Sequence, residues 1–312
     1  MGRRYKKGRP ISGWLILDKD YDVGSTKAVA IAKRLFDAQK AGHAGTLDPL
    51  ATGVLPIALG EATKTAAFVT DAQKRYQFTA RWGAATSTDD AEGEVIATSD
   101  ARPTRDAIEA VLPDFTGLIS QVPPKFSAIK IKGERAYDIA RDGDDVELAA
   151  REIDIHELSL VDIISDDEAV FEAVTGKGAY VRALVRDIAQ ALETQGHVSA
   201  LRRTAVGPFR AEDAVRVCDL EKYEAIEDRD CLLTPISVAL SAVPQTVIDG
   251  PQADRLRRGQ EAILSPAAAK GVRGNDVGDV PTVLASLHDD PVALCSLDGL
   301  KLKPFRVFNL HD

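Results

Sequence analysis

The sequence predicts an α+β chain, in which helices and strands are mixed, with a small β-rich domain at its C-terminal end. Three patterns predict this class. Hydrophobic and polar residues alternate over 76–82, which is typical of a half-buried strand, and apolar residues recur at helical spacing over 179–193. After residue 250, short strand-like runs alternate with Gly, Asp and Pro turns, which favours a separate β-rich unit.

The other elements are expected in order along the chain. A strand over 13–17 precedes a helix over 25–36, which the hydroxyl of Ser25 or Thr26 can cap. A short helix is expected over 104–112, and Gly196 supplies a stop for the helix over 179–193. Further strands are expected over 126–132, 153–164, 168–175, 282–287, 292–297 and 305–310.

A domain boundary is expected within 240–250, where Pro244 and Gly250 interrupt the pattern. The chain then divides into a basic tail (1–10), a main domain (11–243) and a C-terminal domain (244–312). The tail carries five basic residues and no acidic one. It is therefore either a solvated segment or an arm that touches phosphate.

Composition and motif content exclude several classes. The 312 residues are 45% hydrophobic, enough for a large core, and the interrupted apolar runs predict no membrane span. Three scattered cysteines fit a reducing cytoplasm. The common phosphate-loop, dinucleotide and zinc motifs do not occur, so an enzyme without metal or cofactor is expected. The net charge of −9 argues mildly against a nucleic-acid partner, although local clusters of basic side chains decide such binding.

The segment 42–56 holds three glycines and two prolines, which predicts a shaped loop instead of a helix or a central strand. Loops of this length are usually functional or disordered, and the apolar residues here indicate that it packs. Asp48 lies in this loop as a carboxylate. Taken alone, it fits a turn former, a nucleophile, a base, a metal ligand or a cap. His43 alone likewise fits a surface or a packed histidine.

A set of ordered motifs changes this reading. Ala41–Pro56 and Gly60–Lys64 resemble the catalytic loop of the TruB-type pseudouridine synthases, the bacterial enzymes that act on tRNA position 55. The family's later motifs are resembled in order by Lys74-Arg75-Tyr76, Gln121–Ala128, Gly133–Tyr137, Gly176–Leu184 and Leu201–Phe209. Together they span roughly 13–215, and the ordered set is specific. The last domain resembles a PUA-type RNA-binding module more weakly.

One departure from the family concerns the start of the chain. Family members usually carry Asp-Lys-Pro-x-Gly, whereas Asp18-Lys19 is followed here by Asp20-Tyr21-Asp22. Losing that Pro and Gly changes the stiffness of the loop and its tolerance of left-handed backbone.

The resemblance implies a fold and a reaction. The fold is a large mixed, mainly antiparallel sheet flanked by helices. The reaction is the guide-independent conversion of uridine 55 in the tRNA T loop to pseudouridine. The uracil is cut from C1′ of its ribose, turned and rejoined through C5, so no atoms are gained and no cofactor is required. Besides the T arm of tRNA no partner is expected, and the protein is expected to be a cytoplasmic monomer.

The resemblance also assigns roles. Asp48 is the nucleophile on a flipped-out nucleotide, with attack on C1′, addition to C6 and proton removal all left open. Arg182 is its partner, since an opposite charge within ~4–6 Å keeps a buried carboxylate ionised. Tyr76 and Tyr180 bracket the base, and Tyr76 is also a candidate for removing the C5 proton; core packing is its other reading.

The remaining candidates would contact the RNA. Leu201 would close the pocket or belong to the core, and His43 would fill the gap that the extracted nucleotide leaves. Basic candidates for phosphate contacts are Lys19, Lys64, Lys125, Lys130, Lys132, Arg135, Arg202 and Arg203, with Arg255, Arg257 and Arg258 as a second patch.

Three alternatives stay open at this point. The first is the guide-RNA-dependent branch of the same family, which the absence of long Lys/Glu-rich tails disfavours. The second is a non-enzymatic RNA-binding protein or chaperone. The third is an unrelated metabolic enzyme with a lone Asp nucleophile.

Overall fold

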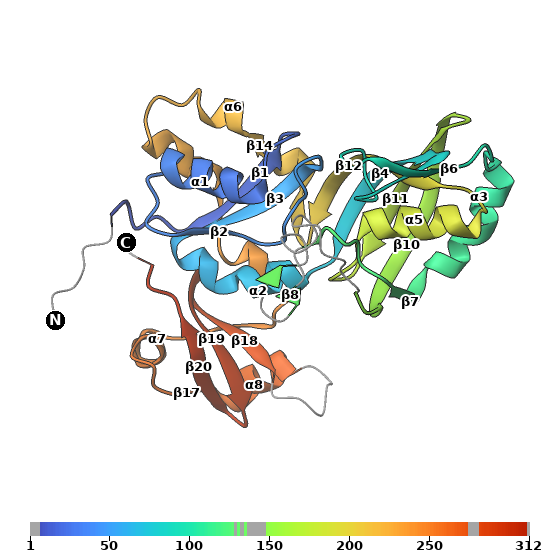
Figure 1. Ribbon diagram of the computed structural model, residues 1–312. Helices are drawn as coiled ribbons and strands as arrows, with labels where there is room; N and C mark the ends of the chain where they lie inside the picture. The colour runs from blue at the N-terminus through green and yellow to red at the C-terminus, as the bar shows by residue number, and fades with distance from the viewer. Residues whose placement is uncertain (1–6, 128–129, 132–133, 136–147, 274–280, 311–312) are drawn as a thin grey trace.

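The computed structural model describes residues 7–127, 130–131, 134–135, 148–273 and 281–310 (Figure 1). Within these residues the main feature is an 11-stranded sheet in the order β14-β1-β3-β12-β4-β11-β10-β7, with β2, β13 and β15 paired beside this path. Its described strand pairs are antiparallel except β1 with β14 and β3 with β12. The predicted mixed, mainly antiparallel sheet is therefore confirmed.

The strands of this sheet are β1 (Gly13–Lys19), β2 (Ala41–His43), β3 (Thr52–Leu59), β4 (Lys74–Trp82), β7 (Gly117–Gln121), β10 (Arg151–Ser165), β11 (Glu168–Thr175), β12 (Gly196–Val206), β13 (Phe209–Arg210), β14 (Val215–Arg216) and β15 (Leu233–Thr234). Two small hairpins pair β5 (Ala84–Thr86) with β6 (Val95–Thr98) and β8 (Lys130–Ile131) with β9 (Glu134–Arg135). The helices are α1 (Ser25–Leu35), α2 (Ala66–Asp71), α3 (Arg105–Val111), α5 (Val181–Ala191), α6 (Val217–Leu220), α7 (Gly250–Arg257) and α8 (Pro266–Arg273). Short 3₁₀ turns are η1 (Gly60–Thr65), η2 (Leu112–Phe115), η3 (Ala211–Asp213), η4 (Glu227–Leu232) and η5 (Val238–Leu240).

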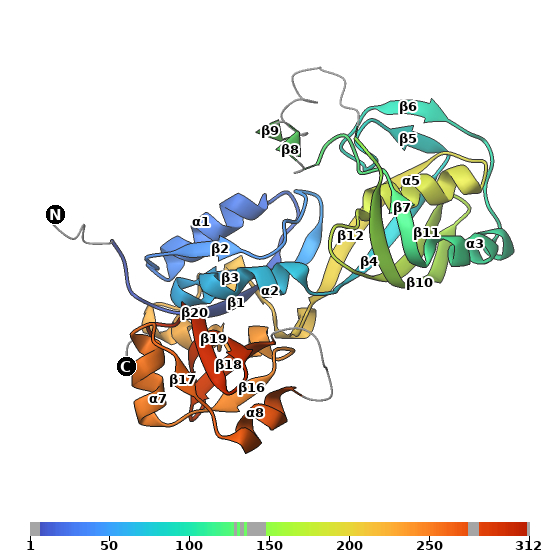
Figure 2. The ribbon, with the colours of Figure 1, turned by 90° about the horizontal axis from the view of Figure 1, so that it is seen from below.

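The sheet has two halves with different surroundings, and Figures 1 and 2 show them apart with β12 and β4 between them. In the first half, around β1 and β3, both sheet faces are buried. Leu15 and Leu55 pack with α1, whereas Trp14 and Ile16 pack with residues of the C-terminal sheet. The near-continuous apolar run of this segment follows from that double burial.

In the second half, around β4 and β11, helices cover only one face. Phe78 and Phe171 stack there with ring centroids 5.4 Å apart, in one cluster with Leu184 and Val185 of α5. The residues of β4 alternate between buried and exposed along almost its whole length. The predicted half-buried strand and the helix against it are thus confirmed.

The five-stranded C-terminal sheet has the order β16-β18-β19-β20-β17. Its strands are β16 (Gln245–Val247), β17 (Ala262–Ile263), β18 (Thr282–Leu287), β19 (Asp290–Asp298) and β20 (Lys301–Val307). The predicted β-rich C-terminal part is confirmed, although its last strand begins earlier than the expected 305–310. Phe308 of this part packs into the core cluster that contains Trp14 of the first half.

The expectation that Gly53 and Pro56 exclude a central strand is wrong, because β3 contains both and lies between β1 and β12. Gly53 has φ +97, and a Cβ there would lie 2.2 Å from the Arg203 carbonyl oxygen, so only glycine lets β12 approach. Pro56 lies opposite Ala44, just past the last residue of β2, where its carbonyl oxygen accepts from the Ala44 N–H. Its missing N–H can give no bond in return, and the pairing of β2 with β3 ends at His43 and Ile57.

Two smaller expectations need correction. Gly196 does not end α5: the chain turns at Glu193, with φ 54, and Gly196 begins β12 against the Trp82 ring. Of the strand expected over 126–132, residues 126–127 form a bend and 130–131 form β8, whereas 128–129 and 132 lie outside the described residues.

Asp22, which stands where the family usually carries glycine, has a left-handed φ of 58. Aspartate tolerates this conformation better than most residues other than glycine.

Candidate active site

Asp48 lies in the loop 44–51, which joins β2 to β3 and packs against α1. The hydroxyl of Ser25 accepts from the Leu47 N–H at 2.9 Å and donates to the Leu47 carbonyl at 2.8 Å. The N-cap of α1 is Gly24, which makes no side-chain cap hydrogen bond. The expected capping by Ser25 or Thr26 is therefore wrong, because the loop takes up the Ser25 hydroxyl instead.

Two buried cations support the backbone of this loop from inside. The Lys19 ammonium donates to the Pro49 and Asp20 carbonyls at 2.9 and 3.0 Å, and burial lowers the pKa of Lys19 to about 8. The Arg203 guanidinium donates to the carbonyls of Gly45, Thr46 and Val54 at 3.0, 3.2 and 2.8 Å.

Both cations were expected to contact phosphate. Their side chains are among the most buried of the molecule, at 1% exposure each. Burial removes them from the surface that RNA could reach, so Lys19 and Arg203 act as supports of the Asp48 loop. The backbone of Arg203 also connects two parts of the site, because it lies opposite Gly53 of β3 on one side and Tyr76 of β4 on the other.

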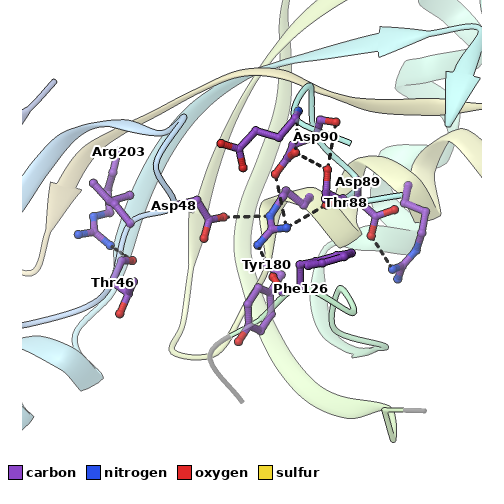
Figure 3. Close-up of polar contacts among 12 residues, drawn as sticks. Thr46, Asp48, Thr88, Asp89, Asp90, Phe126, Tyr180 and Arg203 are labelled. Carbon is purple, nitrogen blue, oxygen red and sulfur yellow. Dashed lines mark hydrogen bonds and ion pairs between the residues drawn. The ribbon is translucent and has the colours of Figure 1, made fainter. Parts of the chain in front are cut away.

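The structure brings Asp48 and Arg182 together (Figure 3). Arg182 belongs to the first turn of α5, and its Nε lies 2.9 Å from Oδ2 of Asp48. The two side chains differ in burial: Arg182 is 6% exposed, and Asp48 is 39% exposed. The carboxylate is thus paired on one side and open on the other.

Arg182 uses its remaining donors inside the protein. Nη1 donates to the Thr88 carbonyl and Nη2 to the Phe126 carbonyl, each at 2.9 Å. Nη1 also lies 3.4 Å from Oδ2 of Asp90, a buried carboxylate that accepts from the Glu92 N–H at 3.0 Å. The guanidinium therefore has a fixed orientation, with Asp48 on one edge and Asp90 beyond it.

Sequence reasoning missed Asp90. The signal was the adjacent pair of acids 89–90 in a turn rich in Ser, Thr and Gly, but nothing in the sequence connects that turn to α5. Burial raises the pKa of the Glu92 carboxyl, and the nearby carboxylates of Asp90 and Asp48 raise it further.

Tyr180 immediately precedes α5, and the buried side-chain amide of Gln121 holds its backbone. The Tyr180 N–H donates to Gln121 Oε1 at 2.9 Å, and Gln121 Nε2 donates to the Tyr180 carbonyl at 3.2 Å. Burial raises the pKa of Tyr180, and the nearby Asp48 carboxylate adds to this. Figure 3 shows the Tyr180 ring below the carboxylate of Asp48.

Tyr76 and Leu201 lie on the strands that join the two halves. Tyr76 is 9% exposed and belongs to the cluster that also holds Val181 of α5. Leu201, on β12, packs against the cores of both halves. Both residues therefore make the contacts expected if they pack in the core. They make these contacts where the two halves meet, next to the Asp48 loop.

The other predicted contact residues are spread over the surface. His43 is half-buried at the end of β2, and Arg202 forms a two-pronged ion pair with Asp18 at 2.9 and 2.8 Å. That pair raises the pKa of Arg202. The Lys64 ammonium donates to Glu61 at 2.5 Å and to the Val307 carbonyl at 2.7 Å, so its hydrogen bonds connect η1 to the C-terminal part.

Among the last basic candidates, Lys125 is exposed, as are Arg255, Arg257 and Arg258 at the end of α7. Lys132 and the side chains of Lys130 and Arg135 lie outside the described residues. Of the basic tail, Arg9 is described, and it pairs with Asp230 at 2.5 Å; residues 1–6 lie outside the described part.

Across the described residues, no three or more His, Cys, Asp or Glu side chains gather where they could hold a metal ion. Nor does any helix in the described part combine the length and apolarity that crossing a membrane requires.

Residues 33–181 match the family model of the TruB family pseudouridylate synthase N-terminal domain, and residues 182–241 match the tRNA pseudouridylate synthase B C-terminal domain. A tRNA pseudouridine synthase B of Bradyrhizobium diazoefficiens is 52% identical over 97% of this chain and 87% of its own length. The Caulobacter vibrioides protein of the same name is 50% identical over 99% of this chain and 100% of its own length.

Solved structures are similar in fold. The chain of a Cbf5–Nop10–Gar1 complex superposes with a TM-score of 0.72 and 25% identity, covering 95% of this chain and 85% of that one. A chain of an H/ACA ribonucleoprotein bound to a substrate RNA gives a TM-score of 0.73 at 23% identity, covering 100% and 92%.

Proposed function

This chain belongs to the TruB family of pseudouridylate synthases, and from this premise we propose that it converts uridine 55 in the T loop of tRNA to pseudouridine. The family makes the chain an isomerase that acts on tRNA. It sets aside the sequence-based alternatives of a non-enzymatic RNA-binding protein and of an unrelated metabolic enzyme.

The proposed reaction breaks the bond between N1 and C1′ and forms a bond between C5 and C1′. C5 loses a proton and N1 gains one, so atoms and charge balance without a co-reactant. We assign the nucleophile to Asp48 because its carboxylate is paired with Arg182 at 2.9 Å and is still 39% exposed. This single observation carries the proposal, since a nucleophile must be both held in place and reachable.

The nucleotide must leave its stack to reach Asp48, and aromatic faces compensate part of that cost. We assign Tyr180 to this role because its backbone is fixed by Gln121 and because the Asp48 carboxylate is near enough to add to the raised pKa of its phenol; Figure 3 draws the ring below that carboxylate. Tyr76 is assigned as the second face, and as a candidate acceptor of the C5 proton, from its place at the junction of the two halves.

We further propose that the enzyme acts without a guide RNA and without an obligate protein partner. The support is similarity: relatives named tRNA pseudouridine synthase B are about 50% identical over nearly the whole chain, whereas the chain from the Cbf5 complex is 25% identical. The PUA-like nature of the C-terminal part and the contacts of its basic patch remain predictions.

The test uses the purified chain and an unmodified tRNA transcript with tritium at C5 of uracil. We expect tritium release and pseudouridine at one T-loop position, with no other macromolecule present. Asp48→Asn keeps the shape of the side chain, and it should bind the transcript within about twofold of wild type but lose at least ~10³-fold in rate. Normal turnover by Asp48→Asn, or modification elsewhere in the tRNA, would contradict the assignment.

A further inference from the structure

α5 carries a second arginine, Arg186, one helical turn beyond Arg182, and residues four apart lie on the same helix face. We propose that Arg186 is a positioning residue for pseudouridine formation, because it anchors the two loops that orient Arg182 toward Asp48. This inference rests on the proposed function of Asp48 and Arg182 and deepens it.

The two arginines bind the same two loops at different points. Arg182 binds Thr88 and Asp90 of the loop 87–94, between β5 and β6, and the Phe126 carbonyl of the loop 122–127, after β7. Arg186 binds the same loops further out. Its Nη1 donates to Asp89 Oδ2 at 3.0 Å, and its Nη2 donates to the Val122 carbonyl at 2.7 Å.

Arg186 thereby crosslinks two loops whose inner residues are the acceptors of Arg182. The loop 122–127 also follows directly on Gln121, which fixes the backbone of Tyr180. A shift of either loop would therefore move acceptors of the Arg182 guanidinium. A shift of the loop 122–127 would also move Gln121, which holds the backbone of Tyr180. The link between Arg186 and the reaction is indirect, through Arg182, because the hydrogen bonds and ion pairs of Arg186 go to Asp89, Asp187 and Val122.

The first of these loops has a reason to need an anchor. Asp89 has a left-handed φ of 60, a conformation that costs energy in a residue other than glycine. Its side chain is 15% exposed, so the carboxylate is largely withdrawn from water and is stabilised by Arg186. Arg186 also pairs with Asp187 at 2.9 Å. Its side chain is 21% exposed, against 6% for Arg182, so a substitution of Arg186 should leave the fold intact.

The experiment measures pseudouridine formed at any tRNA position under single-turnover conditions, together with the dissociation constant for the same transcript. We expect Arg186→Gln to lower the rate about tenfold to a hundredfold, in line with a small misplacement of catalytic groups, and to leave the dissociation constant within about twofold. Arg186→Lys, which keeps the charge but not the fork, should recover part of the rate.

Asp89→Asn keeps a residue that tolerates the left-handed backbone and removes only the charge. Its rate should fall less than that of Arg186→Gln, because the bond to the Val122 carbonyl stays. The double variant should be no slower than Arg186→Gln alone, since Asp89→Asn weakens only the bond between Arg186 and Asp89, which Arg186→Gln has already removed.

Arg102→Gln is the matched control. Arg102 also combines a carboxylate, that of Asp167, with backbone carbonyls at Ser99 and Ala101, but none of these belongs to either loop. We expect its rate to match wild type. The inference is overturned if Arg186→Gln turns over at the wild-type rate, or if Arg102→Gln is slowed as much. Should Asp48→Asn be fully active, the proposed function itself would fail, a result distinct from an active Arg186→Gln beside an inactive Asp48→Asn.

Discussion

The two halves of the large sheet hold their charged groups in opposite ways. In the first half, the buried cations Lys19 and Arg203 bind backbone carbonyls of the loop, while the carboxylate of Asp48 stays partly exposed. In the second half, the buried cation is itself the group that meets the site: Arg182, held by the Thr88 and Phe126 carbonyls and by Asp90, pairs directly with Asp48. The first half holds the backbone of the Asp48 loop and leaves the Asp48 carboxylate partly exposed. The second half holds the Arg182 guanidinium in one orientation.

The strongest test of this contrast changes the fixed charge. Arg182→Gln should lower the single-turnover rate by about 10³-fold, because the Asp48 carboxylate loses the cation that pairs with it and orients it. It should also lower the free energy of unfolding, since the buried Asp90 loses its cation. Adding Asp90→Asn should restore stability, measured by urea denaturation, without restoring the rate. Recovery of the rate in the double variant would break the distinction between the halves.

The second test removes a support of the open half. Arg203→Met leaves the carbonyls of Gly45, Thr46 and Val54 without their donor, and we expect the free energy of unfolding to fall by about 3 kcal/mol. Urea denaturation measures this loss. Arg202→Met is the control on the preceding residue of β12; the ion pair of Arg202 is partly exposed and should contribute less than ~1 kcal/mol. Equal losses of unfolding free energy for the two variants would show that the buried hydrogen bonds of Arg203 stabilise the fold no more than the partly exposed ion pair of Arg202 does.

The third test uses pH to examine Lys19, the other support of the Asp48 loop. Burial lowers the pKa of Lys19 from 10.5 to about 8, so between these values the unfolded chain binds more protons than the folded one. Stability therefore rises with pH through this window, as the cost of burying the charged ammonium disappears. Relative to Lys19→Met, the free energy of unfolding of the wild-type chain should rise by about 2 kcal/mol from pH ~7.5 to ~10. A constant difference between the two proteins would refute this burial effect.

Much of the second half could be predicted from the sequence. The alternation over 76–82, the stripe of α5 and the short helix expected over 104–112 are local patterns, and the structure places a strand or helix at each. Such patterns are reliable because one face of the sheet meets helices and the other meets water. The first half lacks that asymmetry, and its strand β3 runs through a glycine and a proline that by local rules should end it.

The site divides in the same way. The motifs predicted that Asp48 and Arg182 lie together, and they do so at 2.9 Å. Sequence alone could not show that Arg203 is buried, because the carbonyls that accept its hydrogen bonds are about 150 residues away in the chain. Asp90 and Arg186 were missed for the same reason: each acts through a loop whose partner is fixed by the tertiary structure.

The ladder of β12 with both β3 and β4 has a consequence for how an RNA is selected. Strand pairing joins the half that carries Asp48 to the half that carries Arg182, because β12 pairs with β4 over most of its length and with β3 at Arg202 and Arg203. These bonds oppose a movement of one half toward the other. Under the proposed function, the distortion that brings a uridine to Asp48 then falls on the nucleic acid. An RNA whose loop opens at low cost is favoured over one that resists, and discrimination among tRNA segments becomes a matter of deformability as well as of base identity.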